Sequence, residues 1–116
     1  MTSMQIDVTS HDGYFLARTS GQIDETAREP FREHLHPLVG QKGTRLIIDL
    51  AGSPRVNSPG IGNLVALTAD ANTNNSRVVL CNLQPYFSMV IGVTKLDRFF
   101  TIVTDLDAAV AKCREE

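Results

Sequence analysis

The stretch of sequence that decides the fold reads Leu46-Ile47-Ile48-Asp49-Leu50-Ala51-Gly52-Ser53-Pro54-Arg55-Val56-Asn57-Ser58-Pro59-Gly60-Ile61-Gly62. Its first part, Leu46–Leu50, is an almost continuous apolar run, which is typical of a parallel strand covered on both faces. A loop of small and turn-forming residues follows over Ala51–Ser58. Beyond the loop, one helical stripe is formed by Ile61, Leu64, Val65 and Thr68. The stretch therefore predicts a buried strand, a loop and a helix, in that order.

Toward the N-terminus, the pattern predicts two short strands joined by a tight turn. The strands are Gln5–Val8 and Tyr14–Arg18, and His11-Asp12-Gly13 lies between them. Asp-Gly between two apolar-rich runs is a strong signal for a β-hairpin. We therefore expect an antiparallel hairpin at the start of the chain.

A first helix is expected between the hairpin and the buried strand. Gly21 breaks the strand pattern, and Asp24 fits a helix N-cap. The apolar face of this helix consists of Phe31, Leu35 and Leu38. Pro30 leaves two alternatives, because proline has no N–H: the regular helix begins at Pro30, or Pro30 bends its first turn. Gly40 and Gly43 are expected to end the helix.

A second strand–helix unit follows the central one. Asn72–Ser76 is polar turn material, and Arg77–Cys81 reads as a second buried strand. Pro85 is well placed as the first residue of a helix, where its missing N–H costs nothing. The inner face of that helix is expected to be Phe87, Val90 and Ile91.

The last unit is a short strand and a closing helix. Phe100–Val103 has the composition of a strand. Thr104, with Asp107 three positions later, resembles a capping box at a helix start. The apolar face of the closing helix consists of Leu106, Ala109, Val110 and Cys113.

Alternating strands and helices with continuous apolar strands predict an α/β domain. We expect one mixed sheet carrying about four helices, with right-handed crossovers between parallel strands. The 116 residues, 12.7 kDa in all, suffice for one domain with an ordinary core. No repeat, linker or low-complexity tract divides the chain, so residues 1–116 are expected to form a single domain.

Composition argues against several classes of protein. With 11 basic and 13 acidic residues the net charge is −2, and aromatic residues make up 6% with no Trp. A nucleic-acid-binding domain usually carries a basic patch and aromatic stacking platforms, so binding to nucleic acid is not expected. No run approaches the roughly 20 apolar residues of a membrane span, and no secretion signal is evident. A cytoplasmic location is expected.

Neither a metal site nor a cofactor is expected. The two cysteines, Cys81 and Cys113, are too far apart for a zinc motif and are expected to be packing residues. His34 and His36 are two positions apart, so on a helix their side chains do not face one another. Asp49 is expected to face outward or to cap a strand end.

The most specific candidate site is the start of the helix after the central strand. Ligand and partner sites in open α/β sheets lie beyond the carboxyl ends of the strands. Ser58 followed by Pro59 fits an N-cap serine with proline at the first helical position, and Gly60 and Gly62 are expected to leave the first turn open. Free N–H groups there would accommodate a phosphate on Ser58. The alternative is that Ser58 is only a cap.

Short motifs are spread over the chain at Gly21–Asp24, Leu50–Gly52, Val56–Gly62, Leu80–Asn82 and Val93–Phe100. Together they resemble the STAS family, the anti-sigma-factor antagonists. Leu50–Gly52 followed by Val56–Gly62 resembles the family's Leu-x-Gly, apolar residue and Asp-Ser-Ser-Gly before a helix. Leu80–Asn82 resembles its Leu-x-Asn, Val93–Phe100 contains a match to its Thr-Gly-Leu-Asp-x-x-Phe, and Gly21–Asp24 resembles its Gly-x-Leu-Asp. The similarity spans nearly the whole chain with matching spacings.

This resemblance implies a non-enzymatic regulator of transcription. Family members bind an anti-sigma factor, often a serine kinase, and thereby release a sigma factor. The kinase phosphorylates the serine that aligns with Ser58, and a PP2C-type phosphatase restores it. The implied partner-binding residues are Asp24, Asn57, Ser58, Gly60, Ile61 and Gly62. For Asp24 the alternative role is that of a helix cap.

Two departures from the family pattern define an alternative function. Asn57 stands in place of the family's Asp, and Pro59 in place of its second Ser. They favour a STAS scaffold without a switch, a subunit of a stress-sensing or transporter-associated complex. A serine enzyme built on Ser58 has little support, because no G-x-S-x-G and no neighbouring base are present. Tyr86, Met89 and Val93 are interpreted as the fringe of the core; the alternative is an exposed patch that contacts a protein.

Overall fold

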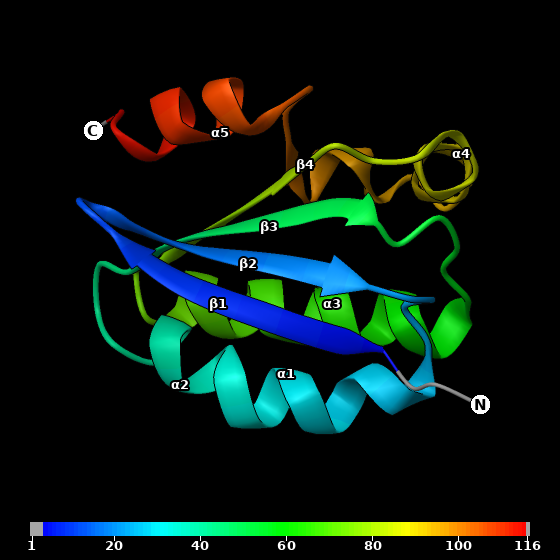
Figure 1. Cartoon of the computed structure of the whole chain (residues 1–116), viewed down its shortest axis with the longest axis horizontal. Helices are drawn as coiled ribbons and strands as arrows, with labels where there is room; N and C mark the ends of the chain where they lie inside the picture. The colour runs from blue at the N-terminus through cyan, green and yellow to red at the C-terminus, as the bar shows by residue number, and fades with distance from the viewer. Residues whose placement is uncertain (1–3, 116) are drawn as a thin grey trace.

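The computed structural model describes residues 4–115 and contains one five-stranded mixed sheet in the order β1-β2-β3-β4-β5 (Figure 1). Strands β1 and β2 form the antiparallel hairpin, and the pairs from β2 to β5 are parallel. The strands are β1 Gln5–His11, β2 Tyr14–Ser20, β3 Arg45–Gly52, β4 Arg77–Cys81 and β5 Thr101–Ile102. The expected α/β fold with a mixed sheet is confirmed.

The helices lie on both faces of this sheet (Figure 1). They are α1 Arg28–His34, α2 His36–Val39, α3 Ser58–Thr73, α4 Pro85–Val93 and α5 Leu106–Cys113, with 3₁₀ turns η1 Glu25–Ala27 and η2 Leu96–Arg98. Helices α1, α2 and α3 cover one face, and α5 covers the other face of β3 and β4. Helix α4 lies at the end of the sheet where β3 ends.

Strand β3 is buried on both faces, as its apolar run predicts. Leu46, Ile48 and Leu50 belong to the larger core under α1 and α3. Ile47 faces the smaller core, which consists of Leu16, Ile47, Val79, Cys81, Ala109 and Cys113. The prediction that both cysteines are packing residues is confirmed, since Cys81 and Cys113 are buried.

The hairpin is confirmed, with strands longer than expected. Its turn is Asp12-Gly13, and His11 pairs with Tyr14 at the end of the ladder. Gly13 has a φ of +89°, a conformation that side-chain-bearing residues rarely adopt. The turn chemistry of Asp-Gly therefore sets the register of the hairpin.

The structure excludes one of the two alternatives for Pro30. Asp24 caps the 3₁₀ turn η1, which continues into α1, so the helix does not begin at Pro30, which lies inside the first turn of α1 as the second alternative places it. A break separates α1 from α2 at Leu35. Pro37 explains that break, because it cannot donate to the carbonyl of Glu33 four residues earlier.

Two expected helix caps are wrong by one position. Asn57, not Ser58, caps α3, so Pro59 occupies the second helical position. Asp105, not Thr104, caps α5 through a hydrogen bond from the Ala108 amide at 2.9 Å. A short Asx side chain reaches the amide three residues on, and in both cases it outcompetes the neighbouring hydroxyl residue.

Two other boundaries also move. Helix α3 extends to Thr73, so the polar turn occupies only Asn74–Ser76, and Asn75 takes a φ of 56° there. Strand β5 is limited to Thr101–Ile102. Within residues 4–115, no helix combines the length and the apolar character needed to cross a bilayer.

Candidate functional site

The site lies at the carboxyl ends of β2 and β3, where two loops are joined by backbone hydrogen bonds. The Ile23 amide donates to the carbonyl of Arg55 at 3.0 Å, and the Asn57 amide donates to the carbonyl of Ile23 at 3.2 Å. This isolated parallel bridge between Ile23 and Val56 extends the pairing of β2 and β3. It brings Asp24 and Ser58 to the same end of the sheet.

A glycine permits the close packing of these two loops. A Cβ on Gly60 would overlap the carbonyl group of Ile23, so only glycine lets α3 start this close to residues 23–24. The expectation that Gly60 opens the first turn to a ligand is wrong, because Gly60 is buried and its amide is already bonded. Gly62 has open space where a side chain would lie, as expected.

Asn57 organises the start of α3. Its Oδ1 accepts a hydrogen bond from the Gly60 amide at 2.9 Å, and its Nδ2 donates to Glu25 Oε1 at 3.1 Å. An aspartate could cap the helix equally well, but it could not donate to Glu25. The amide at this position therefore links the helix cap to the facing loop.

Ser58 is the first residue of α3 and is exposed. Neither its hydroxyl nor its amide makes a hydrogen bond within residues 4–115. Pro59 has no N–H, and the Gly60 amide is bonded to Asn57. Of the first three helical positions, Ser58 alone therefore has a free backbone donor. A phosphate on Ser58 would meet a weaker N-terminal site than the sequence suggests.

Asp24 is a helix cap, which is one of the two roles that the sequence predicts for it. Its Oδ1 accepts hydrogen bonds from the amide of Thr26 at 2.9 Å and from the Thr26 hydroxyl. Its backbone carbonyl accepts from Asn63 Nδ2 at 3.0 Å, which ties η1 to α3. Glu25 and Asn63 belong to no recognisable sequence motif, so only their tertiary contacts reveal their part in the site.

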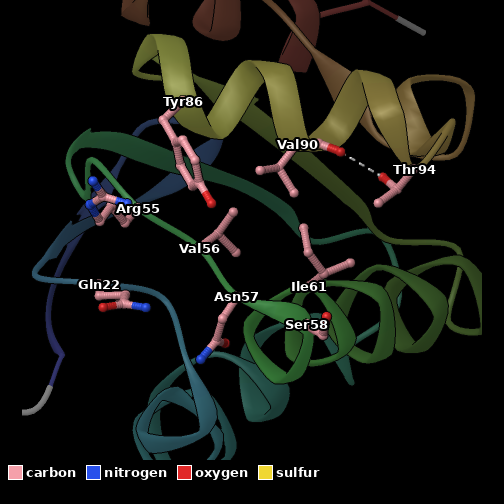
Figure 2. A pocket seen from close by; sticks show the side chains of 9 residues that line it. All are labelled: Gln22, Arg55, Val56, Asn57, Ser58, Ile61, Tyr86, Val90 and Thr94. Atoms are coloured by element: carbon pink, nitrogen blue, oxygen red, sulfur yellow. Dashed lines mark hydrogen bonds between the residues drawn. The ribbon is translucent and has the colours of Figure 1, made fainter.

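A pocket of about 380 Å³ opens between the start of α3 and α4 (Figure 2). Tyr86 and Val90 of α4 point toward Val56 and Ile61 on the opposite wall. The full lining is Gln22, Arg55, Val56, Asn57, Ser58, Ile61, Tyr86, Val90 and Thr94. The expected site residues Asn57, Ser58 and Ile61 thus share one cavity, whereas Asp24, Gly60 and Gly62 do not line it.

Arg55 and Tyr86 meet at this pocket. The Arg55 guanidinium carbon is 4.9 Å from the centroid of the Tyr86 ring, in a cation–π contact. Arg55 was not predicted as a site residue; its one signal in the sequence is that it is the single charged residue of the loop before α3. The interpretation of Tyr86, Met89 and Val93 as core fringe is wrong, because all three are exposed.

A buried network of polar side chains lies at the end of β3, under the loop that leads to Ser58. Asp49 Oδ1 accepts from the Ala51 amide at 3.0 Å and from Asn82 Nδ2 at 3.1 Å. Asp49 is only 8% exposed, so of its two expected roles it caps the strand end and does not face outward. Beside it, the hydroxyls of Thr19 and Ser53 are 2.6 Å apart. These contacts fix the path of the chain from β3 toward Ser58.

The histidines and cysteines lie away from Ser58. His36 Nδ1 is 2.8 Å from Asp70 Oδ2, and His11 stacks on Tyr14 at the far end of the hairpin. No cluster of three metal-ligating side chains occurs in the part of the chain that the structure describes. Burial raises the pKa of the Cys81 thiol to about 12, with the Asp49 carboxylate adding to the shift. That thiol is therefore a poor nucleophile.

Comparison with known proteins places the fold and the site in a family. The family model of the STAS domain matches residues 5–109 of this chain. An anti-sigma factor antagonist from Mycobacterium paratuberculosis is similar with a TM-score of 0.84 and 25% identity, over 97% of this chain and 96% of that one. The family model covers all five strands and ends within α5.

Two further solved structures share the fold. A variant of RsbS from Moorella thermoacetica has a TM-score of 0.79 and 20% identity, over 95% of each chain. The phosphorylated form of SpoIIAA, a Bacillus cell fate determinant, has a TM-score of 0.69 and 18% identity, over 97% of this chain and 100% of that one. With the family model matching most of its length, this chain belongs to the STAS domain family.

Proposed function

We propose that this protein is an anti-sigma factor antagonist, which binds an anti-sigma factor of the serine-kinase type and thereby releases a sigma factor. The observation that carries the proposal is the exposed Ser58 hydroxyl at the first turn of α3, beside Asp24 on the facing loop. The docking residues are Asp24, Asn57, Ser58, Ile61 and Gly62, and the buried Gly60 contributes by letting α3 start close to the facing loop. The similarity to an antagonist from Mycobacterium paratuberculosis over nearly the whole chain supports this assignment.

Phosphorylation of Ser58 is the proposed switch. A phosphoserine carries about −1.5 to −2 charges at neutral pH. With one free amide at the helix start, the domain itself stabilises this charge by only about 0.3–1 kcal/mol. Burying it unpaired in an interface costs several times as much. The partner therefore dissociates while the domain stays folded, and a PP2C-type phosphatase restores binding. The phosphorylated form of SpoIIAA supports the idea that this fold tolerates the modification.

A non-switching scaffold remains the second candidate. The observation in its favour is that Asn57 and Pro59 remove the acidic neighbour and one amide from the segment around Ser58. A subunit of a stress-sensing or transporter-associated complex would use the same surface without modification. Under both candidates we assign no catalytic role to the chain, treat residues 1–116 as a single domain and place it in the cytoplasm, where sigma factors act.

Calorimetry with a candidate anti-sigma kinase tests the proposal. The unmodified protein and Ser58→Ala should bind, and Ser58→Asp should bind at least about tenfold more weakly, which corresponds to roughly 1.4 kcal/mol. Ser10→Asp is the matched control, because it adds the same charge at an exposed serine near the hairpin turn. Equal binding of Ser58→Asp and the unmodified protein would overturn the switch.

Incubation with the kinase and ATP then separates the two candidates. The antagonist gains the mass of one phosphate, which maps to Ser58 and is absent in Ser58→Ala. Binding without any phosphorylation contradicts the switch and favours the scaffold. Absence of binding in every form contradicts the antagonist proposal itself.

A further inference from the structure

The apolar surface of α4 continues the pocket beside Ser58 toward solvent. At about 100° per residue, Tyr86, Met89, Val90 and Val93 fall within an arc of roughly 100° on one side of the helix; we call them the α4 stripe. Tyr86, Met89 and Val93 are 42%, 54% and 75% exposed. No charged residue interrupts the helix between Pro85 and Val93. An apolar stripe of this kind, continuous with a cavity, marks a surface that something covers.

Among the described residues that line the pocket, Arg55 is the one with a charged side chain. Arg55 is exposed and lines the pocket, and the Tyr86 ring holds its guanidinium by the cation–π contact. The ion pairs within residues 4–115 do not include Arg55. No acidic residue lines the pocket. The charge of Arg55 is therefore available to a carboxylate that arrives with an apolar group.

The extent of the surface decides what kind of occupant fits. A small organic anion would fill the cavity of about 380 Å³, but it would leave Met89 and Val93 uncovered. A polypeptide segment covers both the cavity and the stripe. Helix α4 has nine residues, a length of about 13 Å at 1.5 Å per residue, so a segment of a few turns is long enough.

We propose that the pocket and the α4 stripe together receive an amphipathic, acidic segment of the anti-sigma partner. Its apolar side chains pack on Tyr86, Met89 and Val93, and one of its carboxylates pairs with Arg55. This inference rests on the proposed function, because it names the part of the partner that docks beside Ser58. It adds α4 and Arg55 to the docking residues proposed above, which lie in the facing loop and at the start of α3.

The same arrangement explains how a phosphate on Ser58 would act on the partner. Ser58 lines the pocket that receives the acidic segment, so the phosphate and the partner's carboxylate would share one cavity. Like charges at short range in a partly desolvated site repel strongly. The repulsion would be directed at the segment that docks on α4, in addition to any clash at the helix start.

The test compares the anti-sigma kinase's affinity for matched variants by calorimetry. Arg55→Glu should weaken binding at least about tenfold, as should the double variant Met89→Ser with Val93→Ser, because hot spots lose about that much on truncation. Arg114→Glu is the control, since it reverses an exposed arginine just beyond α5, at the opposite end of the molecule (Figure 1). Added salt should reduce the affinity of the unmodified protein more steeply than that of Arg55→Ala. Thermal unfolding verifies that each variant is folded.

The outcomes distinguish this inference from the proposed function. If Ser58→Asp loses binding while Arg55→Glu and the Met89/Val93 double variant bind like the unmodified protein, the inference is overturned and the antagonist stands. If the kinase binds no form, the antagonist proposal and this inference fail together.

Discussion

The carbonyl of Ile23 occupies the space in which a side chain on Gly60 would lie, so α3 starts in direct contact with the loop that carries Asp24. We therefore expect Gly60→Ala to destabilise the protein by about 1–3 kcal/mol, the usual cost of overpacking. Gly62→Ala is the matched control two residues on, where the space is open. It should stabilise the helix by up to about 1 kcal/mol. Urea denaturation measures both, and equal effects of the two variants would contradict the packing argument.

Two substitutions of Asn57 distinguish how much its helix-capping hydrogen bond and its hydrogen bond to Glu25 each contribute to stability. Asn57→Ala should cost about 1 kcal/mol of stability through loss of the cap to Gly60. Asn57→Asp keeps that cap but places a carboxylate against Glu25. Its stability should therefore rise when Glu25→Gln is added, whereas Glu25→Gln in the unmodified protein should be nearly neutral. The double-mutant cycle is measured by chemical denaturation, and additivity of the two changes would refute the contact.

Charge on Ser58 should affect binding and folding in opposite directions. The first turn of α3 contains no acidic residue, so Ser58→Asp should stabilise the domain by about 0.3–1 kcal/mol through the helix dipole. Its binding to the kinase should nevertheless be weakened. Melting temperature and calorimetric affinity, measured on the same sample, check the two effects. A fall in stability would show that the variant loses binding by unfolding.

Asp24 caps η1, and a substitution tests whether its charge also contributes to binding the partner. Asp24→Asn keeps the acceptor for the Thr26 amide and the carbonyl for Asn63, so stability should change by less than about 0.5 kcal/mol. If the charge of Asp24 contacts the kinase, affinity should fall at least about tenfold. Asp12→Asn, in the exposed hairpin turn, removes the same charge as a control. Unchanged affinity would confine Asp24 to capping η1.

The buried thiols should make the protein less stable in alkaline solution. Burial raises the pKa of Cys81 from 9.0 to about 12 in the folded state. Since the unfolded chain loses this proton first, stability that is present below pH 9 is lost as the pH rises toward 12. Cys81→Ala should flatten that decline in urea denaturation between pH 7 and about 10.5. Parallel pH profiles of the two proteins would contradict the assignment.

The sequence predicted best those features that depend on local pattern. The apolar run of β3 predicted burial on both faces, and Asp12-Gly13 predicted the hairpin turn, because periodicity and turn chemistry act within a few residues. The α/β order and the STAS resemblance followed from the same patterns. The exposed hydroxyl of Ser58 lies where that resemblance implied.

The remaining features depend on contacts between distant segments. The pattern predicts Ser58 as the cap and Pro59 as the first helical residue. The Asn57 amide is instead bonded to the carbonyl of Ile23, Asn57 caps the helix, and α3 begins one residue earlier than predicted, at Ser58. The Arg55–Tyr86 contact joins residues thirty-one positions apart. No spacing rule connects such residues, so neither the cap at Asn57 nor the Arg55–Tyr86 pocket could be read from the sequence.

The smaller core has a consequence for how the chain is synthesised. Leu16, Ile47, Val79 and Cys81 are buried against Ala109 and Cys113 of the last helix. Until residues 106–113 have left the ribosome, this aliphatic strip of the growing sheet faces water. A nascent chain paused before residue 106 would thus be a natural client for chaperones and prone to self-association, although the surface around Ser58 would already have been synthesised.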